Sequence, residues 1–339
     1  MRIRIFDVAK ALLIIMVYWF HIPRIFIGWL HENNDMIVSL DNYNQIAFAS
    51  FFMPAFFIIS GYFINTQRSV KETIKRDIQT ILIPMFFLSL ISNLLYSLLY
   101  FYYSGEWWTR FKLYTHLFYW QDSLGLWFLT ALFINKQIIQ ILIRYIKNTT
   151  ILITISMCLC VLGLTLKNGI INIADWFHYK EALLMSPFTL FGYLCKKHQV
   201  EISRGTLENL SLGYVLSLLI LCCTDGKIDG FNLGSAFSTD YVPMALWLGI
   251  SGSAFIMYIS SWVENSKVLN YIGKLTLPLF CLNFFFVDLF LRILKPLVDN
   301  GHAALYVFIV FVCSLGSGII ISSLLNTKYL RWSLGHFKK

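Results

Sequence analysis

Charged side chains are scarce in this sequence, because Asp, Glu, Lys and Arg make up only 13% of its 339 residues. A soluble domain carries roughly 25% charged residues. With 58% hydrophobic residues and a mean hydropathy of +0.66, the chain has too few charges to cover the surface of a soluble globule. We therefore predict an integral membrane protein.

Several other features are missing from the sequence. No stretch rich in Pro, Gly or Ser divides it and no repeat is visible, so residues 1–339 are predicted to form a single domain. None of the spacings among the seven cysteines fits a zinc site, so we interpret the cysteines as packing residues and expect no metal. No small-residue cleavage site follows the first apolar run, which is therefore expected to remain as a membrane span.

Long apolar runs are abundant. A membrane-spanning helix needs about 20 mainly apolar residues, and ten stretches qualify, although the sixth and seventh are short. They are residues 8–28, 46–65, 80–102, 124–146, 149–166, 182–195, 210–224, 242–262, 272–293 and 303–326. The predicted fold class is all-α, a polytopic membrane helix bundle of about ten transmembrane helices.

The basic residues predict the orientation of the bundle. The chain has 27 Lys and Arg against 18 Asp and Glu. With the N-terminus inside, 19 of the 27 fall in segments on the inner side and 8 on the outer side. Cytoplasmic loops carry an excess of Lys and Arg. The distribution therefore predicts both termini in the cytoplasm, and it explains the positive charge without a nucleic-acid partner.

Ionisable residues in the first predicted span are the strongest candidates for function, because a charge within a bilayer is costly. Asp7, Lys10 and His21 lie at i, i+3 and i+14, which places all three on one helix face over a rise of about 21 Å. Pro23 is expected to kink or end the helix. His21 has two interpretations, a general base near neutral pH or a histidine that bonds a neighbouring helix.

Polar residues elsewhere leave alternatives open. The basic cluster that contains Arg68, Lys75 and Arg76 has two interpretations. It sets the orientation of the protein and contacts anionic lipids, or it binds the phosphates of a nucleotide-bearing donor. Lys136 could face a wet cavity or snorkel to the inner boundary. Asp288 and Arg292 are spaced to pair along a helix.

Two further features have a packing interpretation beside a functional one. Ser60 and Gly61 permit close helix approach, and Asn283 fits helix–helix hydrogen bonding. The predicted outside segments 29–45, 103–123 and 167–181 are rich in Trp, Tyr, Asn and Asp. This composition fits either an aromatic belt at the membrane surface or contact with sugars.

Four segments resemble a known family. They are 4–21, with Arg4, Asp7, Lys10 and His21 at the family's spacing; 53–63, Met-Pro-Ala-Phe-Phe followed by Ser-Gly-Tyr-Phe; 126–133, Leu-Trp-Phe-Leu-Thr-Ala-Leu-Phe; and 271–276, Tyr-Ile-Gly-Lys-Leu-Thr. In these segments, in its length and in its predicted helix count, the chain resembles the membrane acyltransferase-3 family, bacterial proteins that O-acylate sugars of surface glycans.

The resemblance implies an acyl-coenzyme A donor, acetyl-CoA most often, with no bound cofactor. It also implies a glycan or lipid-linked sugar acceptor, membrane lipids as surroundings, and a multipass protein of the bacterial inner membrane. The residues matched to these roles are His21 and Asp7 for catalysis; Arg4, Lys10, Arg68, Lys75 and Arg76 for the donor; and Ser60, Trp127 and Asn283 for substrate.

Two positions depart from the family pattern. Many members have a histidine where this chain has Asn283, so a second histidine is not carried over. Members often place an arginine shortly before the proline of the third span, where Thr80 stands here. Which basic residue holds the donor is therefore open.

The predicted function is acyl transfer to a sugar hydroxyl, with His21 as general base or as acyl relay. One alternative is a transporter or flippase for a glycan or lipid, although no matching pair of broken segments marks an inverted repeat. A second alternative is a non-catalytic relative, such as a sensor or assembly subunit.

Overall fold

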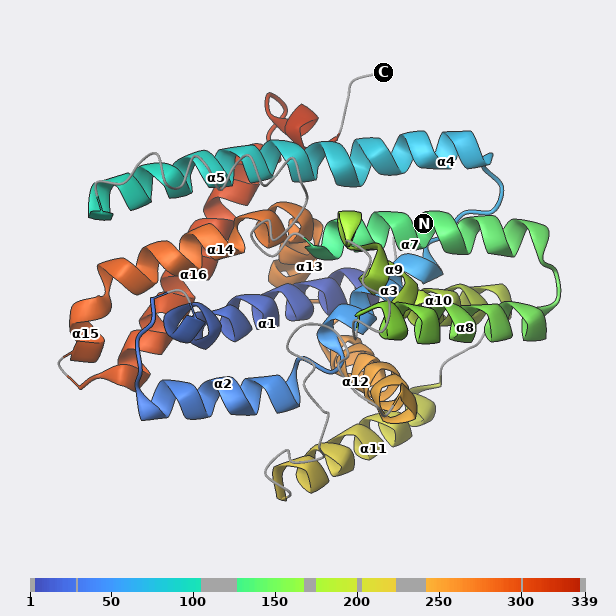
Figure 1. Cartoon of the computed structure of the whole chain (residues 1–339), viewed down its shortest axis with the longest axis horizontal. Coiled ribbons are helices and arrows are strands. Elements are labelled where there is room, and N and C mark those ends of the chain that lie inside the picture. The colour runs from blue at the N-terminus through green and yellow to red at the C-terminus, as the bar shows by residue number, and fades with distance from the viewer. Residues whose placement is uncertain are drawn as a thin grey trace.

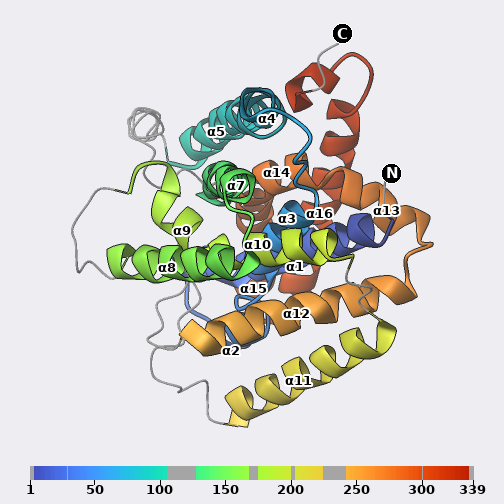
Figure 2. The same cartoon turned by 90° about the vertical axis from the view of Figure 1, so that its right-hand side faces the viewer.

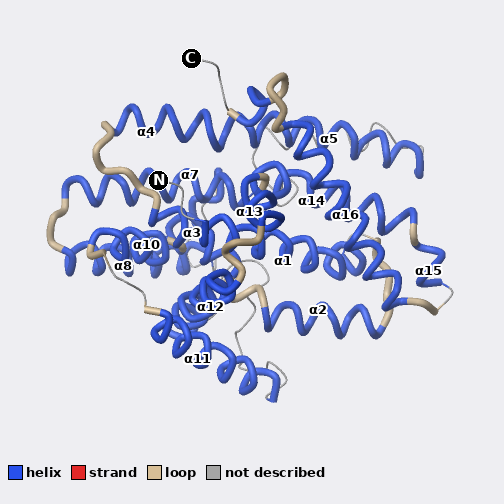
Figure 3. Tube along the Cα trace, turned by 180° about the vertical axis from the view of Figure 1, so that it is seen from behind, coloured by secondary structure: helices blue, strands red, loops and turns tan. Residues whose placement is uncertain are grey.

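The computed structural model describes residues 4–28, 30–104, 127–167, 175–199, 203–223, 242–299 and 301–335. Within these ranges the protein is helical and contains no strand (Figures 1 and 3). The predicted all-α class is therefore confirmed for the described chain.

The helices follow one another with short connections where the chain is described. They are α1 (Arg4–Gly28), α2 (Asp35–Ala47), α3 (Phe52–Tyr62), α4 (Val70–Asp77), the π-helix η1 (Ile78–Leu82), α5 (Ile83–Ser104), α7 (Trp127–Tyr145), α8 (Thr149–Lys167), the 3₁₀ turn η2 (Trp176–His178), α9 (Tyr179–Leu184), α10 (Ser186–Lys197), α11 (Arg204–Cys223), α12 (Val242–Trp262), α13 (Lys267–Lys274), α14 (Thr276–Ile293), α15 (Lys295–Asp299), α16 (Ala303–Leu325) and the 3₁₀ turn η4 (Arg331–Leu334).

Each predicted span overlaps at least one of these helices. Six described helical segments are long and apolar enough to cross a membrane: Arg4–Gly28, Asp35–Tyr62, Thr149–Lys167, Val242–Trp262, Thr276–Ile293 and Ala303–Leu325. The chain is thus an integral membrane protein by the length and composition of its helices. The count of about ten spans and the cytoplasmic placement of both termini stay predictions.

Three predicted spans are interrupted. The span 46–65 is divided between α2 and α3, the span 182–195 breaks at Met185, and the span 272–293 breaks at Leu275. At Met185 the physical reason is Pro187 in the first turn of α10, because its ring has no N–H and suits a helix start. Hydropathy detects apolar length and does not detect such breaks.

Two local features add to what the sequence indicated. Pro23 does not end the first helix, which continues to Gly28. The predicted outside segment 29–45 contains most of α2, whose first turn is capped by the Asn34 side chain accepting the N–H of Ile37. A side-chain cap of this kind satisfies one of the donors that a helix start leaves open.

The third predicted span, residues 80–102, lies within one continuous helical rod that comprises α4, η1 and α5. In η1 the N–H of Ile83 donates to the carbonyl of Ile78, five residues back. Pro84 follows at once and supplies no N–H, so the α-helical ladder is already interrupted there. In Figures 1 and 2 the rod covers one side of the molecule, and α11 lies on the opposite side.

Helix α1 lies at the centre of the bundle, where it contacts α2, α3, α12, α13, α14 and α16. Most of its apolar residues are buried, among them Ile14, Val17 and Tyr18. A helix that is apolar on most of its surface is expected in such a position.

Glycines bring helix backbones into direct contact at three places. A Cβ atom at Gly61 of α3 would lie 1.9 Å from the carbonyl oxygen of Thr189 in α10. A Cβ at Gly192 of α10 would lie 2.0 Å from the carbonyl oxygen of Ile58 in α3. A Cβ at Gly273 of α13 would lie 1.8 Å from the carbonyl oxygen of Asp7 in α1. Any side chain at these positions would push the helices apart.

We predict that Gly192→Ala destabilises the protein by about 1–3 kcal/mol or more, because the added methyl overpacks a backbone contact. Thermal unfolding of the purified protein in detergent measures the loss. Gly316→Ala in α16 is the matched control, because nothing lies within 4 Å of its Cβ position. A helix-interior Gly→Ala change without a clash is favourable by about 0.5–1 kcal/mol. Equal unfolding temperatures for the two variants would contradict this account of the α3–α10 contact.

The predicted orientation places Gly301 outside and Glu264 inside. Single cysteines at these positions, in a background without the native cysteines, should react differently with a membrane-impermeant thiol reagent on intact cells. Gly301→Cys should be labelled at once, and Glu264→Cys only after the membrane is opened. The reverse labelling pattern would show that the topology is inverted. Labelling of both Gly301→Cys and Glu264→Cys on intact cells would require a different number of spans between them.

Candidate functional site

His21 lies half-buried on α1, toward the end away from the N-terminus. Its Nδ1 is 2.8 Å from the carbonyl oxygen of Val17. A carbonyl only accepts, so Nδ1 carries the hydrogen and the neutral ring keeps its lone pair on Nε2. The ring packs on Phe284 of α14, with ring centroids 4.3 Å apart. His21 therefore has the tautomer that a general base acting through Nε2 requires.

Arg4, Asp7 and Lys10 lie at the other end of α1. The buried Asp7 carboxylate is 2.8 Å from the Lys10 ammonium, and the Arg4 guanidinium donates to Asn265 at 3.4 Å. The Asp7 backbone rests on Gly273, so two of the resembling segments meet here. Asp7 lies about 21 Å along the helix from His21, so the two predicted catalytic residues do not share one site.

The face of α1 between these two ends is filled. Ile14 and Tyr18 have 0% of their surface exposed, and the Tyr18 hydroxyl donates to the carbonyl of Leu279 at 3.1 Å. A Cβ at Gly318 of α16 would lie 2.3 Å from the same hydroxyl oxygen. The polar stripe predicted from residue spacing is therefore two separate polar ends joined by a packed middle.

Aromatic residues in and beside the resembling segments of α1, α3 and α7 pack together and against α14. Phe128 of α7 contacts Phe56 and Phe57 of α3, each with ring centroids 5.4 Å apart, and Phe280 of α14 at 5.1 Å. Phe20 of α1 contacts Phe52 of α3 at 5.2 Å. Aromatic pairs of this geometry add about 0.5–1.5 kcal/mol each beyond their burial. Segments far apart in sequence thus form one aromatic core beside α1.

The predicted substrate residues have different surroundings. Asn283 is fully buried next to Phe284, and its amide nitrogen donates to the carbonyl of Phe280 at 2.6 Å. Its carbonyl oxygen has no hydrogen-bond partner in the described structure. Ser60 and Trp127 are half-buried on α3 and α7, and no described contact joins them to His21. Of these three residues, Asn283 is the one that directly precedes Phe284, the residue whose ring contacts His21.

The basic cluster lies on and before α4. Arg68 is half-buried, and Lys75 and Arg76 are exposed. Helix α4 begins with a reciprocal cap between Ser69 and Glu72, and hydrogen bonds from Ser69 lower the pKa of the exposed Glu72 carboxyl. Lys75 also borders an open groove of about 640 Å³, lined by Val70, Lys71, Ile74, Lys75, Ile78, Gln79 and Ile83.

A buried polar network joins α4 to α7. Asp77 is 3% exposed, and its oxygens accept from Lys136 at 2.7 Å and from Gln137 at 2.9 Å. The neighbouring Gln140 donates to Thr73 at 2.8 Å. Lys136 is therefore held by an ion pair with the buried Asp77. In the sequence, Asp77 could have indicated this network, because it is an acidic residue at the start of an apolar run. Its partner Lys136 lies 59 positions away.

Beside this network lies a small basic cavity at the same end of α7. Arg144 donates to the backbone carbonyl of Arg68. The cavity has a volume of about 150 Å³ and is lined by Thr66, Gln140, Ile143, Arg144, Lys147 and Tyr193. Its two cations make it a second place, besides α4, where anionic groups can be held.

Polar residues also surround the end of α1 that carries His21. Arg24, three residues beyond His21, is 3.3 Å from Asp41 of α2, and Gln45 donates to the same carboxylate oxygen at 2.8 Å. Glu32 pairs with Lys295. The sequence did not single out Asp41 or Glu32, because their cations, Arg24 and Lys295, come from other helices. The predicted pair of Asp288 and Arg292 is confirmed at 2.9 Å.

We predict that Asp77→Asn destabilises the protein by about 3–5 kcal/mol, because it leaves Lys136 as a largely buried charge without its counterion. Thermal unfolding in detergent measures the change. Asp77→Asn combined with Lys136→Met should recover part of the loss, and a double-mutant cycle isolates the coupling. Glu264→Gln, at an exposed acid, is the control. Additive effects of the two single changes would mean that the pair contributes nothing.

Comparison with known proteins gives one match. A protein-family model described as an acyltransferase domain matches residues 3–325. No curated protein and no solved structure matches the chain.

Proposed function

The chain belongs to the acyltransferase-3 family, and we propose that it transfers an acyl group, most often acetyl, from cytoplasmic acyl-CoA to a hydroxyl of a glycan or lipid-linked sugar. As a member of that family it is a membrane acyltransferase. The donor, the acceptor and the role of His21 are part of the proposal, as is a location in the bacterial inner membrane.

The observation that carries the proposal is the hydrogen bond of His21. Because Nδ1 is committed to the Val17 carbonyl, Nε2 is the nitrogen that accepts a proton. A sugar hydroxyl has a pKa far above 7 and is a poor nucleophile, so a base must take its proton as the oxygen attacks the thioester carbonyl. The C–S bond then breaks, and the coenzyme A thiolate recovers the proton.

Two chemical routes are compatible with this geometry. In the first, Nε2 deprotonates the sugar hydroxyl directly. In the second, Nε2 attacks the thioester, carries the acyl group and passes it to the hydroxyl. Both routes need the lone pair on Nε2, so both depend on the same tautomer.

The donor would be held by cations at the opposite end of α1. Lys10 and Arg4 lie there, and the proposal adds Arg68, Lys75 and Arg76 from the segment around α4, because phosphates favour charge-assisted contacts with Lys and Arg. Asp7 would orient Lys10 through their ion pair. Since Ile14 and Tyr18 fill the face between Asp7 and His21, the acyl group would approach His21 along another side of α1.

The acceptor would be oriented by Asn283, Ser60 and Trp127. Of these, Asn283 has the strongest support, because its buried carbonyl oxygen lacks a partner one residue from the ring that packs on His21. Because Asn283 is fully buried, a sugar hydroxyl would donate to that oxygen only after the surrounding side chains move aside.

We predict that His21→Ala lowers acyl transfer about 10²–10⁴-fold, which is the usual loss of a general base, while the protein still inserts in the membrane. The assay is acetyl transfer from labelled acetyl-CoA in membranes with matched protein amounts. His302→Ala, at an exposed histidine, should keep wild-type activity. Unchanged transfer by His21→Ala would remove His21 from the mechanism.

Deletion of the protein tests the function as a whole. Mass spectrometry of the surface glycan from the deletion strain should find a polymer of normal amount that lacks acetyl groups. Loss of the polymer itself would instead indicate a glycan or lipid transporter. An unchanged glycan would indicate a different acceptor or a non-catalytic relative.

A further inference from the structure

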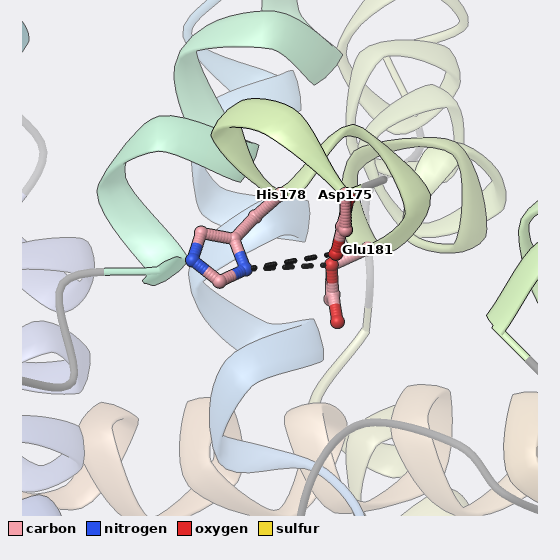
Figure 4. A group of neighbouring side chains, drawn as sticks. All are labelled: Asp175, His178 and Glu181. Carbon is pink, nitrogen blue, oxygen red and sulfur yellow. Dashed lines mark ion pairs between the residues drawn. The ribbon is translucent and has the colours of Figure 1, made fainter. Parts of the chain in front are cut away.

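A compact cluster of metal-ligating side chains lies between α8 and α10, away from His21. It consists of Asp175, His178 and Glu181, and one ligand atom from each lies within 4.8 Å of the other two. In Figure 4 the His178 imidazole turns one nitrogen toward both carboxylates. That nitrogen, Nδ1, is 3.8 Å from Asp175 and 3.7 Å from Glu181.

From this geometry we propose that Asp175, His178 and Glu181 form a site for a divalent transition-metal ion of the zinc type. Zinc binds imidazole nitrogen and carboxylate oxygen at about 2.0–2.2 Å. Ligand atoms around a tetrahedral zinc are therefore about 3.4 Å apart. The two distances from His178 Nδ1 are longer than a nitrogen–oxygen hydrogen bond and need only a few tenths of an ångström of contraction to fit the ion, and the ligand atoms all lie within 4.8 Å of one another.

In each carboxylate, the oxygen that does not face His178 already has a partner. This partner orients the other oxygen, which would bind the metal. Asp175 accepts the backbone N–H of Lys180 through its Oδ1, and its Oδ2 faces His178. Glu181 pairs with Lys167 through Oε1 at 3.4 Å, and its buried Oε2 has no hydrogen-bond partner in the described structure. Outer partners of this kind hold metal-binding carboxylates in position.

The charges of the cluster also favour a cation. Two carboxylates, of Asp175 and Glu181, face the same imidazole nitrogen, and the Lys167 ammonium lies 3.4 Å from one of them, Glu181. A divalent ion held between the carboxylates would balance the remaining negative charge.

The ion would fasten the turn η2 to α9. The expectation of no metal rests on the cysteine spacings, which give no sign of this site. Its ligands lie instead at i, i+3 and i+6, on a turn and a short helix. Phe177 and His178 both have left-handed backbone conformations, with φ of 57° and 55°, and this turn directs the imidazole back over Glu181. The three protein ligands leave a fourth position for water.

Zinc titration of the purified full chain, without a polyhistidine tag and after chelator treatment, tests the site. Calorimetry should find one zinc ion per chain, and His178→Gln and Asp175→Asn should each weaken binding by at least about tenfold. His198→Ala and Glu208→Gln, at an exposed histidine and an exposed acid, should bind as the wild type. Absence of zinc uptake up to about 100 µM, or equal binding by the ligand variants, would overturn the proposal.

Thermal unfolding of the wild type keeps the test independent of how the variants fold. Saturating zinc should raise the unfolding temperature by about 2 °C or more. Magnesium should not, because it prefers six oxygen ligands in octahedral geometry. An equal shift with both ions, or none with zinc, would also count against the site.

Discussion

Direct backbone contact at glycines is the constraint on which the arrangement of this bundle depends. Lipid tails are as apolar as the side chains, so hydrophobicity does not drive helices together within the membrane. Close packing does, and it requires small residues. Gly273 lets α13 touch α1, and Gly61 and Gly192 let α3 and α10 touch each other. The first contact joins two of the four resembling segments, and the other two fix the segment in α3 against α10.

The second organising force is the need to satisfy polar groups away from water. Asp7 pairs with Lys10, Asp77 with Lys136 and Asp288 with Arg292, so the buried carboxylates obtain a cation from their own helix or a neighbour. His21 differs, because its Nδ1 bonds to its own helix and Nε2 is the nitrogen that the proposed reaction uses. This contrast, rather than burial alone, distinguishes a candidate catalytic residue from the structural ion pairs.

The sequence predicted the positions of the long helices well and their interruptions poorly. Residues 242–262 coincide with α12, and residues 303–326 nearly coincide with α16, because the bilayer sets the length of an apolar run. The break at Met185 depends on local backbone chemistry that hydropathy averages away. Helical periodicity predicts Asp7, Lys10 and His21 on one face, and α1 is one continuous helix over these residues. It could not reveal that α14 and α16 cover the middle of that face, because this depends on which helices become neighbours.

The hydrogen bond from His21 to Val17 has a consequence for proton movement. A histidine that conducts protons takes one up on one ring nitrogen and releases another from the second. Here the Nδ1 proton is retained by the carbonyl of the preceding turn, so uptake and release both occur at Nε2. The group that gives this proton and the group that receives it must therefore both reach the same edge of the ring.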